Sequence, residues 1–541
     1  MSTPADTPGT DRALARGAAL ITLATAASRI TGFFRVLAVA AAMGTTFLAS
    51  TYQTANTLPN MLFELVAAGV LTSIFVPTFV EHIVRDEPKE GWDAANAMAS
   101  LAIAGLVALS LVLALFAPLL MRALTIAVRD PVVREQEIEL GAQFLRLFSP
   151  QIVFYGLGMI MTGALHAHRR FGAPAVAPIF NNLVVIGVYL AYVAMRGSEP
   201  PSVVGISGSE ILLLGAGTTA GVVAMTLCLV PHLRSLGWRP RWRWDRNHPA
   251  VRRATRLGVW ALGYAGGYQA GLIVVLIFAN RVAGGVAAYQ WAYTFFYMPH
   301  ALFAVPIFNV LFTALSEHAV RGEEAALSDR LRNGLKMLAF ILFPVAAFLA
   351  AAAGPLTELT LQYGVMTPQG GRLVADVIRA FAIGLPTFSA FLVLTRAFYA
   401  IGDTKRPTLV NAVGVAVASA VGALLFLELP ARWRVPGLAI GHSVGFAVAA
   451  VALFRMFEKR GHALGERTLW SSLIRSALIA LVAFGVMVLV ASGLPAASKS
   501  EALVNLLACS AVGAGAYLGG MKLFGSPELT RAALLVRDLR R

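Results

Sequence analysis

The feature that most constrains this chain is a series of fourteen apolar stretches, each bounded by charged residues, proline or glycine. An α-helix needs about 20 predominantly apolar residues to cross the hydrocarbon core of a bilayer. Because 57% of the residues are hydrophobic and only 13% are charged, an ordinary soluble domain is a poor alternative. We therefore predict an all-α integral membrane protein with about 14 transmembrane helices, at residues 14–44, 51–80, 94–121, 138–165, 174–195, 209–231, 255–280, 286–316, 334–353, 373–400, 407–428, 435–457, 469–492 and 501–524.

The positive charges predict the orientation of these helices. An even number of spans places both termini on one side, and 30 of the 44 Lys and Arg residues fall on that side. Loops on the cytoplasmic side of a membrane are rich in Lys and Arg, so both termini are predicted to be cytoplasmic. The basic, tryptophan-containing segment 234–256 is too polar to span and is predicted to lie along the inner membrane surface. The net charge of +16 therefore indicates membrane orientation and no nucleic-acid partner.

No catalytic or cofactor-binding pattern is recognisable. Phosphate-binding glycine loops, nucleophile elbows and clustered carboxylates are missing from the sequence. His166 and His168 lack metal-ligand spacing, and Cys228 and Cys509 lie in apolar stretches where they are predicted to be buried thiols. We expect no enzyme activity, no metal and no cofactor.

An internal repeat divides the chain. Arg146, Ala167 and Pro174 recur at Arg379, Ala400 and Pro407, each 233 residues later, and the prolines of "TLPN" and "YMPH" are 240 residues apart. The second unit begins six helices after the first, so the two halves have the same orientation, as in a two-lobed carrier. The predicted organisation is a disordered N-terminus (1–13), a first lobe (14–233), the linker (234–256), a second lobe (257–460), two appended helices (461–525) and a cytoplasmic tail (526–541).

Two arginines interrupt the first apolar stretch. Arg29 lies roughly 22 Å from the start of the span, and Arg35 lies roughly 14 Å from its end. A charge at mid-membrane costs about 2.5 to 3.5 kcal/mol unless it faces water or a counter-charge. Glu64 in the second stretch is the candidate counter-charge, which leaves an ion cluster that fixes helix packing as one interpretation. Because one acid cannot neutralise two bases, we favour an anion-binding site.

The second stretch supplies further candidate residues. Asn60, in "ANTLPN", follows a proline that would loosen the helix and free backbone groups to line a cavity, although a kink without a ligand role is an equal alternative. The second half does not repeat the arginines, since the positions matching them are Gln269 and Val275. Charge recognition is therefore predicted in the first lobe.

Several motifs resemble the MurJ/MviN lipid II flippases of the multidrug/oligosaccharidyl-lipid/polysaccharide exporter superfamily. These are "SRITGFFR" (28–35), "TLPNMLFELVAAGVLTSIFVPTF" (57–79), "HRRFGAPAVAPIFNN" (168–182), "QYGVMTPQG" (362–370) and "RAFYAIGDTKRPTLVNA" (396–412). The resemblance implies two six-helix lobes around a central cavity, with the last two helices forming a groove for an isoprenoid tail. It also implies that Arg29 and Arg35 match the essential cavity arginines of that family.

The chain departs from the family pattern at several positions where many members carry a charged residue. Val36 stands where many members carry an acid, Phe63 and Glu64 stand where they carry basic residues, and Thr294 stands where they carry an arginine. Our hypothesis is a flippase for lipid II in the bacterial inner membrane, with lipid II, membrane lipids and cell-wall synthesis proteins as partners and with Arg29, Arg35, Asn60 and Glu64 binding the substrate. The alternatives are an exporter of another polyprenyl-linked saccharide, a drug or cation exporter, and a non-transporting scaffold.

Overall fold

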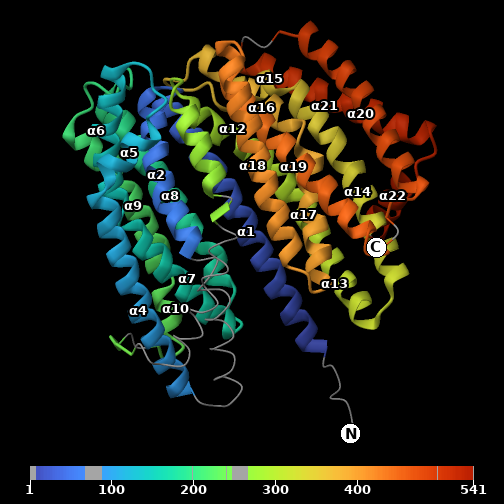
Figure 1. Ribbon diagram of the computed structural model, residues 1–541, viewed down its shortest axis with the longest axis horizontal. Helices are drawn as coiled ribbons and strands as arrows, with labels where there is room; N and C mark the ends of the chain where they lie inside the picture. The colour runs from blue at the N-terminus through green and yellow to red at the C-terminus, as the bar shows by residue number, and fades with distance from the viewer. Residues whose placement is uncertain are drawn as a thin grey trace. The chain divides into compact units, whose positions relative to one another are not determined.

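The computed structural model describes residues 8–66, 88–197, 199–238, 241–245, 266–267, 269–462, 464–495 and 498–539. Every regular element in this part of the chain is a helix (Figure 1). The chain divides into two compact units, Met1–Gln269 and Ala270–Arg541. The expected all-α membrane fold is confirmed.

The first unit is built from nine labelled helices in its described part. They are α1 (Pro8–Met43), α2 (Phe47–Val66), α4 (Pro88–Leu115), α5 (Ala117–Leu124), α6 (Pro131–Phe148), α7 (Gln151–Ala167), α8 (Gly172–Arg196), α9 (Gly208–Leu227) and α10 (Val230–Arg234). Within this unit α1 packs along α8, α8 along α9, and α2 against α6 and α7.

The second unit begins within a short apolar helix, Gln269–Ala279. Its labelled elements are α12 (Gly285–Pro299), η2 (His300–Ala304), α13 (Val305–Arg321), α14 (Glu324–Ala351), α15 (Ala353–Thr360), α16 (Pro368–Ala382), α17 (Leu385–Ala400), α18 (Lys405–Glu428), η3 (Ala431–Trp433), α19 (Arg434–Glu458), α20 (Arg467–Gly493), α21 (Lys499–Leu523) and α22 (Pro527–Leu539). The last helix, α22, occupies the region predicted as a tail and packs on α14 and α21.

The described residues contain ten helices long and apolar enough to cross a membrane, or twelve if two bent pairs each count as one span. The bent pairs are α4 with α5, at 64°, and α16 with α17, at 48°. Two further predicted spans lie partly outside the described residues, at 67–80 and at 255–265. The total of fourteen therefore stays a prediction.

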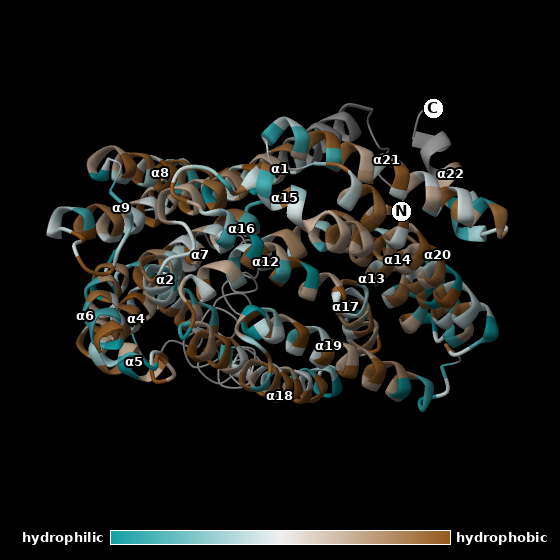
Figure 2. Ribbon diagram, turned by 90° about the horizontal axis from the view of Figure 1, so that it is seen from above, coloured by the Kyte–Doolittle hydropathy of each residue, from teal (hydrophilic) through white to brown (hydrophobic). Residues whose placement is uncertain are grey.

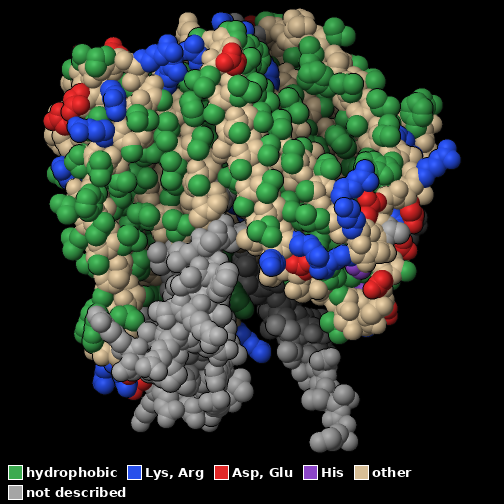
Figure 3. Space-filling view, viewed as in Figure 1, with side chains coloured by type: hydrophobic (Ala, Val, Ile, Leu, Met, Phe, Trp, Pro, Cys, Tyr) green, Lys and Arg blue, Asp and Glu red, His purple; other side chains and the backbone are tan. Residues whose placement is uncertain are grey.

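Apolar side chains cover the middle of the face drawn in Figure 3, and charged side chains gather toward the helix ends. The same pattern is visible along single helices in Figure 2, where long segments of α18 and α20 are brown. Leucines and valines such as Leu478, Leu481, Val482 and Leu489 on α20 are exposed. A surface of this kind is stable against lipid and unfavourable in water, which agrees with the membrane assignment.

A tight turn connects α1 to α2. Gly44 ends α1 with a φ of 57°, a conformation in which a side chain would be strained, and its N–H donates to the Ala40 carbonyl at 2.9 Å. Two residues later the hydroxyl of Thr46 accepts from the Ala49 N–H at 3.2 Å and so caps the start of α2. This turn joins the arginine-bearing helix, which packs on α8, to the helix that carries the other predicted site residues, which packs on α6 and α7.

The repeat is visible in the backbone of both units. α7 ends with Arg169 at a φ of 58°, and α17 ends 233 residues later with Gly402 at a φ of 76°. In the first turn the Arg170 N–H donates to the Leu165 carbonyl at 2.8 Å, and in the second the Asp403 N–H donates to the Phe398 carbonyl at 2.9 Å. The following helices, α8 and α18, also begin 233 residues apart. The same helix ending therefore occurs with glycine in one half and with arginine in the other.

The turn after α17 also holds a compact charged cluster. Asp403 pairs with Arg406 at 2.8 Å and with Arg460 at 2.7 Å. Partial burial raises the pKa of Asp403, but hydrogen bonds from the backbone and guanidinium of Arg406, together with the Arg460 charge, outweigh burial and hold the pKa below its ordinary value. The cluster ties the start of α18 to the end of α19.

Helices α18 and α19 are in especially close contact. A Cβ placed on Gly441 would lie 2.5 Å from the carbonyl oxygen of Ala418 and from the backbone of Gly422. Small residues at four-residue intervals let membrane helices approach this closely. They are Gly414, Ala418 and Gly422 on α18 and Gly437, Gly441 and Gly445 on α19.

Part of the predicted linker is described and lies along α4. The backbone N–H groups of Arg241 and Arg243 donate to the side chains of Asn96 and Ser100, at 3.3 and 2.9 Å. Trp242 and Trp244, which alternate with these arginines, stack on each other and are 65% and 50% exposed. Residues 239–240 and 246–256 of this linker lie outside the described residues, and its contact with lipid stays a prediction.

Candidate functional site

The two arginines of α1 differ in their surroundings. The side chain of Arg29 is exposed and that of Arg35 is half-buried, as expected for residues separated by about 120° around a helix. On the adjoining face Asn182 of α8 donates to the Ser28 carbonyl at 3.2 Å and to the Thr31 hydroxyl at 3.0 Å. These bonds fix the rotation of α1 on α8, and with it the directions in which the two guanidinium groups leave the helix.

Neither arginine is neutralised by an acid in the part of the chain that the structure describes. Glu64, the candidate counter-charge, instead accepts a hydrogen bond from Gln269, the last residue of the first unit, at 2.6 Å. The ion cluster of Arg29, Arg35 and Glu64 considered from the sequence is therefore not formed. One oxygen of the Glu64 carboxylate accepts from this amide, and no ion pair joins Glu64 to either arginine among the described residues.

A stripe of polar residues runs along α2 at four-residue intervals. Tyr52, Asn56, Asn60 and Glu64 occupy successive turns of the helix, so they form one slowly rotating line on its surface. We call these four residues the α2 polar stripe. Two of the predicted site residues, Asn60 and Glu64, belong to it.

Tyr155 of α7 connects the α2 polar stripe to Arg35. The Asn60 side chain and the charges of Arg35 and Glu64 are all close enough to the Tyr155 hydroxyl to affect its electrostatics. Its ring stacks on Phe63 with centroids 5.2 Å apart. Three of the four predicted site residues are thus gathered around one tyrosine, and Arg29 is the member that this tyrosine does not reach.

The buried end of the α2 polar stripe is held by a hydroxyl cluster. The Tyr52 hydroxyl lies 3.1 Å from that of Tyr189 and 2.6 Å from that of Thr218, so one residue of α2 is bonded to both α8 and α9. The Arg35 charge acts on both tyrosines. Hydroxyl groups near a half-buried cation satisfy it only weakly compared with a carboxylate or phosphate. Arg35 therefore keeps its capacity to bind an anion.

The middle of the stripe is held by an amide. Gln151 of α7 donates to the Asn56 side chain at 3.3 Å and to the Thr219 hydroxyl at 3.2 Å. The Asn60 amide donates to the Asn56 carbonyl at 2.9 Å. These bonds position the stripe and leave the side-chain oxygen of Asn60 available to the neighbouring Tyr155 and to a ligand.

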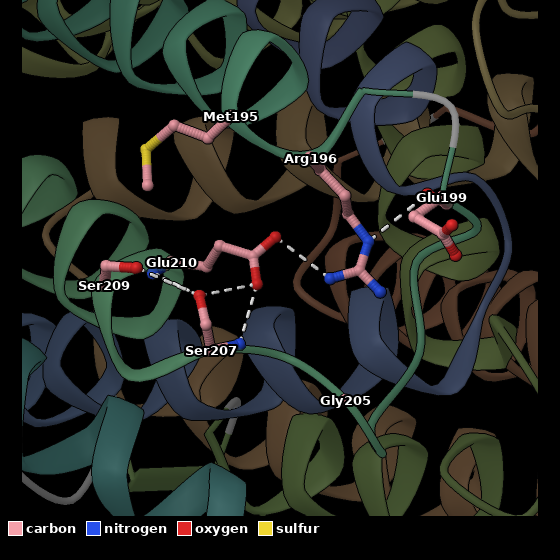
Figure 4. A pocket seen from close by; sticks show the side chains of 7 residues that line it. All are labelled: Met195, Arg196, Glu199, Gly205, Ser207, Ser209 and Glu210. Carbon is pink, nitrogen blue, oxygen red and sulfur yellow. Dashed lines mark hydrogen bonds and ion pairs between the residues drawn. The ribbon is translucent and has the colours of Figure 1, made fainter.

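A separate cavity of about 420 Å³ lies at the opposite ends of α8 and α9 (Figure 4). Arg196 and Glu210 face each other across it with an N–O distance of 3.0 Å, and Glu210 also accepts from Ser207 at 2.9 Å. The Arg196 guanidinium further donates to the Pro200 carbonyl at 2.8 Å. The bonds of Arg196 to Glu210 and Pro200 hold the loop between the two helices. Because the charges of Arg196 and Glu210 neutralise each other, the cavity is a poor anion site.

The sequence reasoning missed Tyr155 and the rest of the polar stripe. A signal was present, because Tyr52 and Asn56 precede Asn60 and Glu64 at a constant interval of four. Likewise Gln151 and Asn182 are polar residues within stretches assigned to the membrane, where such side chains face protein or water. The sequence pattern could not show that these polar residues, which lie on different helices, come together in the folded chain.

Comparison with known proteins agrees with the motifs. The model of the family "Lipid II flippase MurJ" matches residues 39–507. The chain belongs to the MurJ family. It is 29% identical over 465 residues to a probable lipid II flippase MurJ of Rhizobium tropici, covering 86% of this chain and 84% of that protein. It is 27% identical over 459 residues to the lipid II flippase MurJ of Burkholderia cenocepacia, covering 82% and 84%.

Solved structures show the same fold. A lipid II flippase MurJ in an inward closed conformation superposes with a TM-score of 0.73 at 19% identity, covering 96% of this chain and 100% of that one. An inward-facing multidrug resistance MATE transporter superposes with a TM-score of 0.66 at 14% identity, covering 80% and 94%. MurJ proteins are multi-pass membrane transporters of the bacterial inner membrane and are not enzymes, and this chain is assigned to that class.

Proposed function

We propose that this protein flips lipid II, the undecaprenyl-pyrophosphate-linked peptidoglycan precursor, from the cytoplasmic to the outer leaflet by alternating access. Arg29 and Arg35 bind the pyrophosphate, and Asn60 and Glu64 contact the sugar-peptide head group. The isoprenoid tail stays in the bilayer beside α20 and α21. Both termini are cytoplasmic in this proposal.

The observation that carries the proposal is the surplus positive charge on α1. Arg29 and Arg35 have no acidic partner among the described residues, and Glu64 is engaged by Gln269. Leaving two cations in a membrane helix costs about 2.5 to 3.5 kcal/mol each at mid-membrane. A pyrophosphate bound by two guanidinium groups offsets that cost with charge-assisted hydrogen bonds.

The polar stripe suits the remainder of the substrate. Sugar hydroxyls and peptide amides lose a few kcal/mol each when they leave water without new hydrogen bonds. Asn60, Glu64 and Tyr155 offer both donors and acceptors beside Arg35. A polar path of this kind removes most of the barrier that the hydrocarbon core presents to the head group.

Complementation of a strain depleted of its own flippase tests the proposal. Arg29→Ala and Arg35→Ala should fail to support growth while reaching the membrane in normal amounts. Arg129→Ala is the matched control, because Arg129 is an exposed arginine in the loop before α6, and it should complement fully. Growth with both α1 arginines removed would contradict the proposal and favour a scaffold that does not transport.

The neutral residues at Val36, Phe63 and Thr294 favour a second candidate substrate, another polyprenyl-linked saccharide. A direct flipping assay in proteoliposomes separates the two. Purified protein should move fluorescent lipid II between leaflets in a manner blocked by Arg35→Ala. Transport of a polyprenyl-pyrophosphate-linked saccharide that lacks the peptide, with no transport of lipid II, would favour the second candidate.

A further inference from the structure

Glu137 of α6 is an acid buried inside the first unit. Its side chain is 0% exposed. One carboxyl oxygen accepts from the Thr51 hydroxyl of α2 at 3.4 Å, near the limit for a hydrogen bond. The other carboxyl oxygen has no hydrogen-bond partner. No other described residue bonds to this group, so it is held at the contact of α6 with α2 by one weak interaction.

No neighbouring charge balances this carboxyl group. Helix α6 packs against α2, α4, α5 and α9, and no charged side chain is among the groups that act on Glu137. Glu64 on α2 bonds to Gln269, Asp93 on α4 pairs with Arg243, and Glu210 on α9 pairs with Arg196. Arg134 lies three residues before Glu137 on the same side of α6, but its guanidinium donates to the Arg122 carbonyl at 3.5 Å and forms no ion pair with Glu137. The remaining described charged groups are exposed: Arg122 on α5 and Glu135, Glu139 and Arg146 on α6.

Elementary electrostatics then sets the protonation state. An ionised carboxylate without a cation or several hydrogen-bond donors is very unfavourable away from water, and such a group takes up a proton instead. A protonated carboxyl group is neutral, so burying the oxygen that has no hydrogen-bond partner costs less free energy than it would in the carboxylate. Glu137 is therefore neutral in this packed arrangement and would ionise only if water reached it.

The partner of Glu137 lies on the helix that carries the proposed substrate site. Thr51 and Asn60 are nine residues apart on α2, about 13.5 Å along the axis. Pro59 lies between them inside the helix and has no N–H to bond the Ala55 carbonyl. Only this one bond is missing from a helix that is otherwise continuous, so a ligand that displaces the Asn60 end also acts on the Thr51 end.

We propose that Glu137 is a proton-binding site that couples movement of the substrate to proton exchange. In the packed arrangement the carboxyl group keeps its proton. When α2 moves away from α6 and water enters, the O–H bond breaks, the proton passes to water as hydronium, and the carboxylate remains. Return of α2 requires a proton to be taken up again. This inference rests on the proposed function, because it assumes that the substrate acts on α2.

Infrared spectroscopy of the purified full-length protein tests the protonation state without any substrate. The carbonyl stretch of a protonated carboxyl group should be present in the parent and in Glu139→Gln, which alters an exposed acid two residues away on the same helix. It should be lost in Glu137→Gln. Glu137→Asp should keep a band at a shifted position, which controls for misfolding of the glutamine variant. A parent spectrum unchanged by Glu137→Gln would overturn the proposal.

Flipping in proteoliposomes tests the coupling. With one proton exchanged per cycle, a gradient of one pH unit should change the steady-state ratio of fluorescent lipid II between leaflets by about tenfold. The parent and Glu139→Gln should show this change, and Glu137→Gln should flip without it. Equal responses in all three would refute the coupling. Absence of flipping in the parent would instead refute the proposed function, while the infrared result would still stand.

Discussion

Substitution of Gly441 by alanine should destabilise the second unit. The added Cβ would lie 2.5 Å from the Ala418 carbonyl oxygen and 2.5 Å from the Gly422 backbone. A Cβ does not approach heavy atoms this closely in real structures, and the obstacle is backbone, which cannot rotate away. Helices α18 and α19 must therefore separate, and overpacking of this kind costs about 1 to 3 kcal/mol.

Two opposing effects decide the net result. Alanine is favoured over glycine inside a helix by about 1 kcal/mol, which offsets part of the clash. The separation of α18 from α19 also loosens the contacts around Gly414 and Gly445, where added Cβ atoms would meet neighbours at 2.9 and 2.3 Å. We expect a net loss of about 1 to 2 kcal/mol, because the close contact is continuous over several turns.

Gly485→Ala is the matched control. Gly485 lies in the middle of α20, and a Cβ there would meet nothing within 4 Å. Thermal unfolding in detergent, followed with a dye that fluoresces on reaction with the buried Cys509 thiol, should show a lower midpoint for Gly441→Ala and an unchanged or higher one for Gly485→Ala. Equal midpoints for the two variants would refute the packing argument.

Three further predictions concern single contacts. Arg169→Gly should raise the free energy of unfolding by about 1 kcal/mol, and Gly402→Ala should lower it by a similar amount, because only glycine adopts a positive φ without strain. Unfolding midpoints of the two variants that do not move in opposite directions would contradict this. Tyr155→Phe should weaken the apparent affinity for lipid II in the flipping assay by about fivefold, the value of one hydrogen bond, and an unchanged affinity would exclude the hydroxyl from recognition. Because the pKa of Asp403 is lowered, its contribution to stability is present above the ordinary value of about 3.9 and is lost as the pH falls below it. Unfolding midpoints between neutral and acid pH should therefore fall more steeply for the parent than for Asp403→Asn.

The predictability of the site differs between its members. Arg29 and Arg35 were identifiable because a charge inside an apolar stretch is unusual whatever surrounds it. Asn60 and Glu64 were identifiable only as polar residues in the next stretch, and among the described residues Glu64 bonds to Gln269 and forms no ion pair with either arginine. Tyr155 was not identifiable at all, since a tyrosine in an apolar helix is ordinary until its neighbours are known.

The sequence by itself determined that the chain is helical, that it belongs in a membrane, where most spans lie, and that its halves repeat. Hydropathy and helix length act locally along the chain, and a repeat offset such as that of Ala167 and Ala400 needs no knowledge of packing. Only the tertiary structure decided that Glu64 bonds to Gln269, that Tyr155 joins Arg35 to Asn60, and that Glu137 is buried without a counter-charge. Those contacts depend on how each helix is rotated against its neighbours, and that rotation is set by many side chains at once.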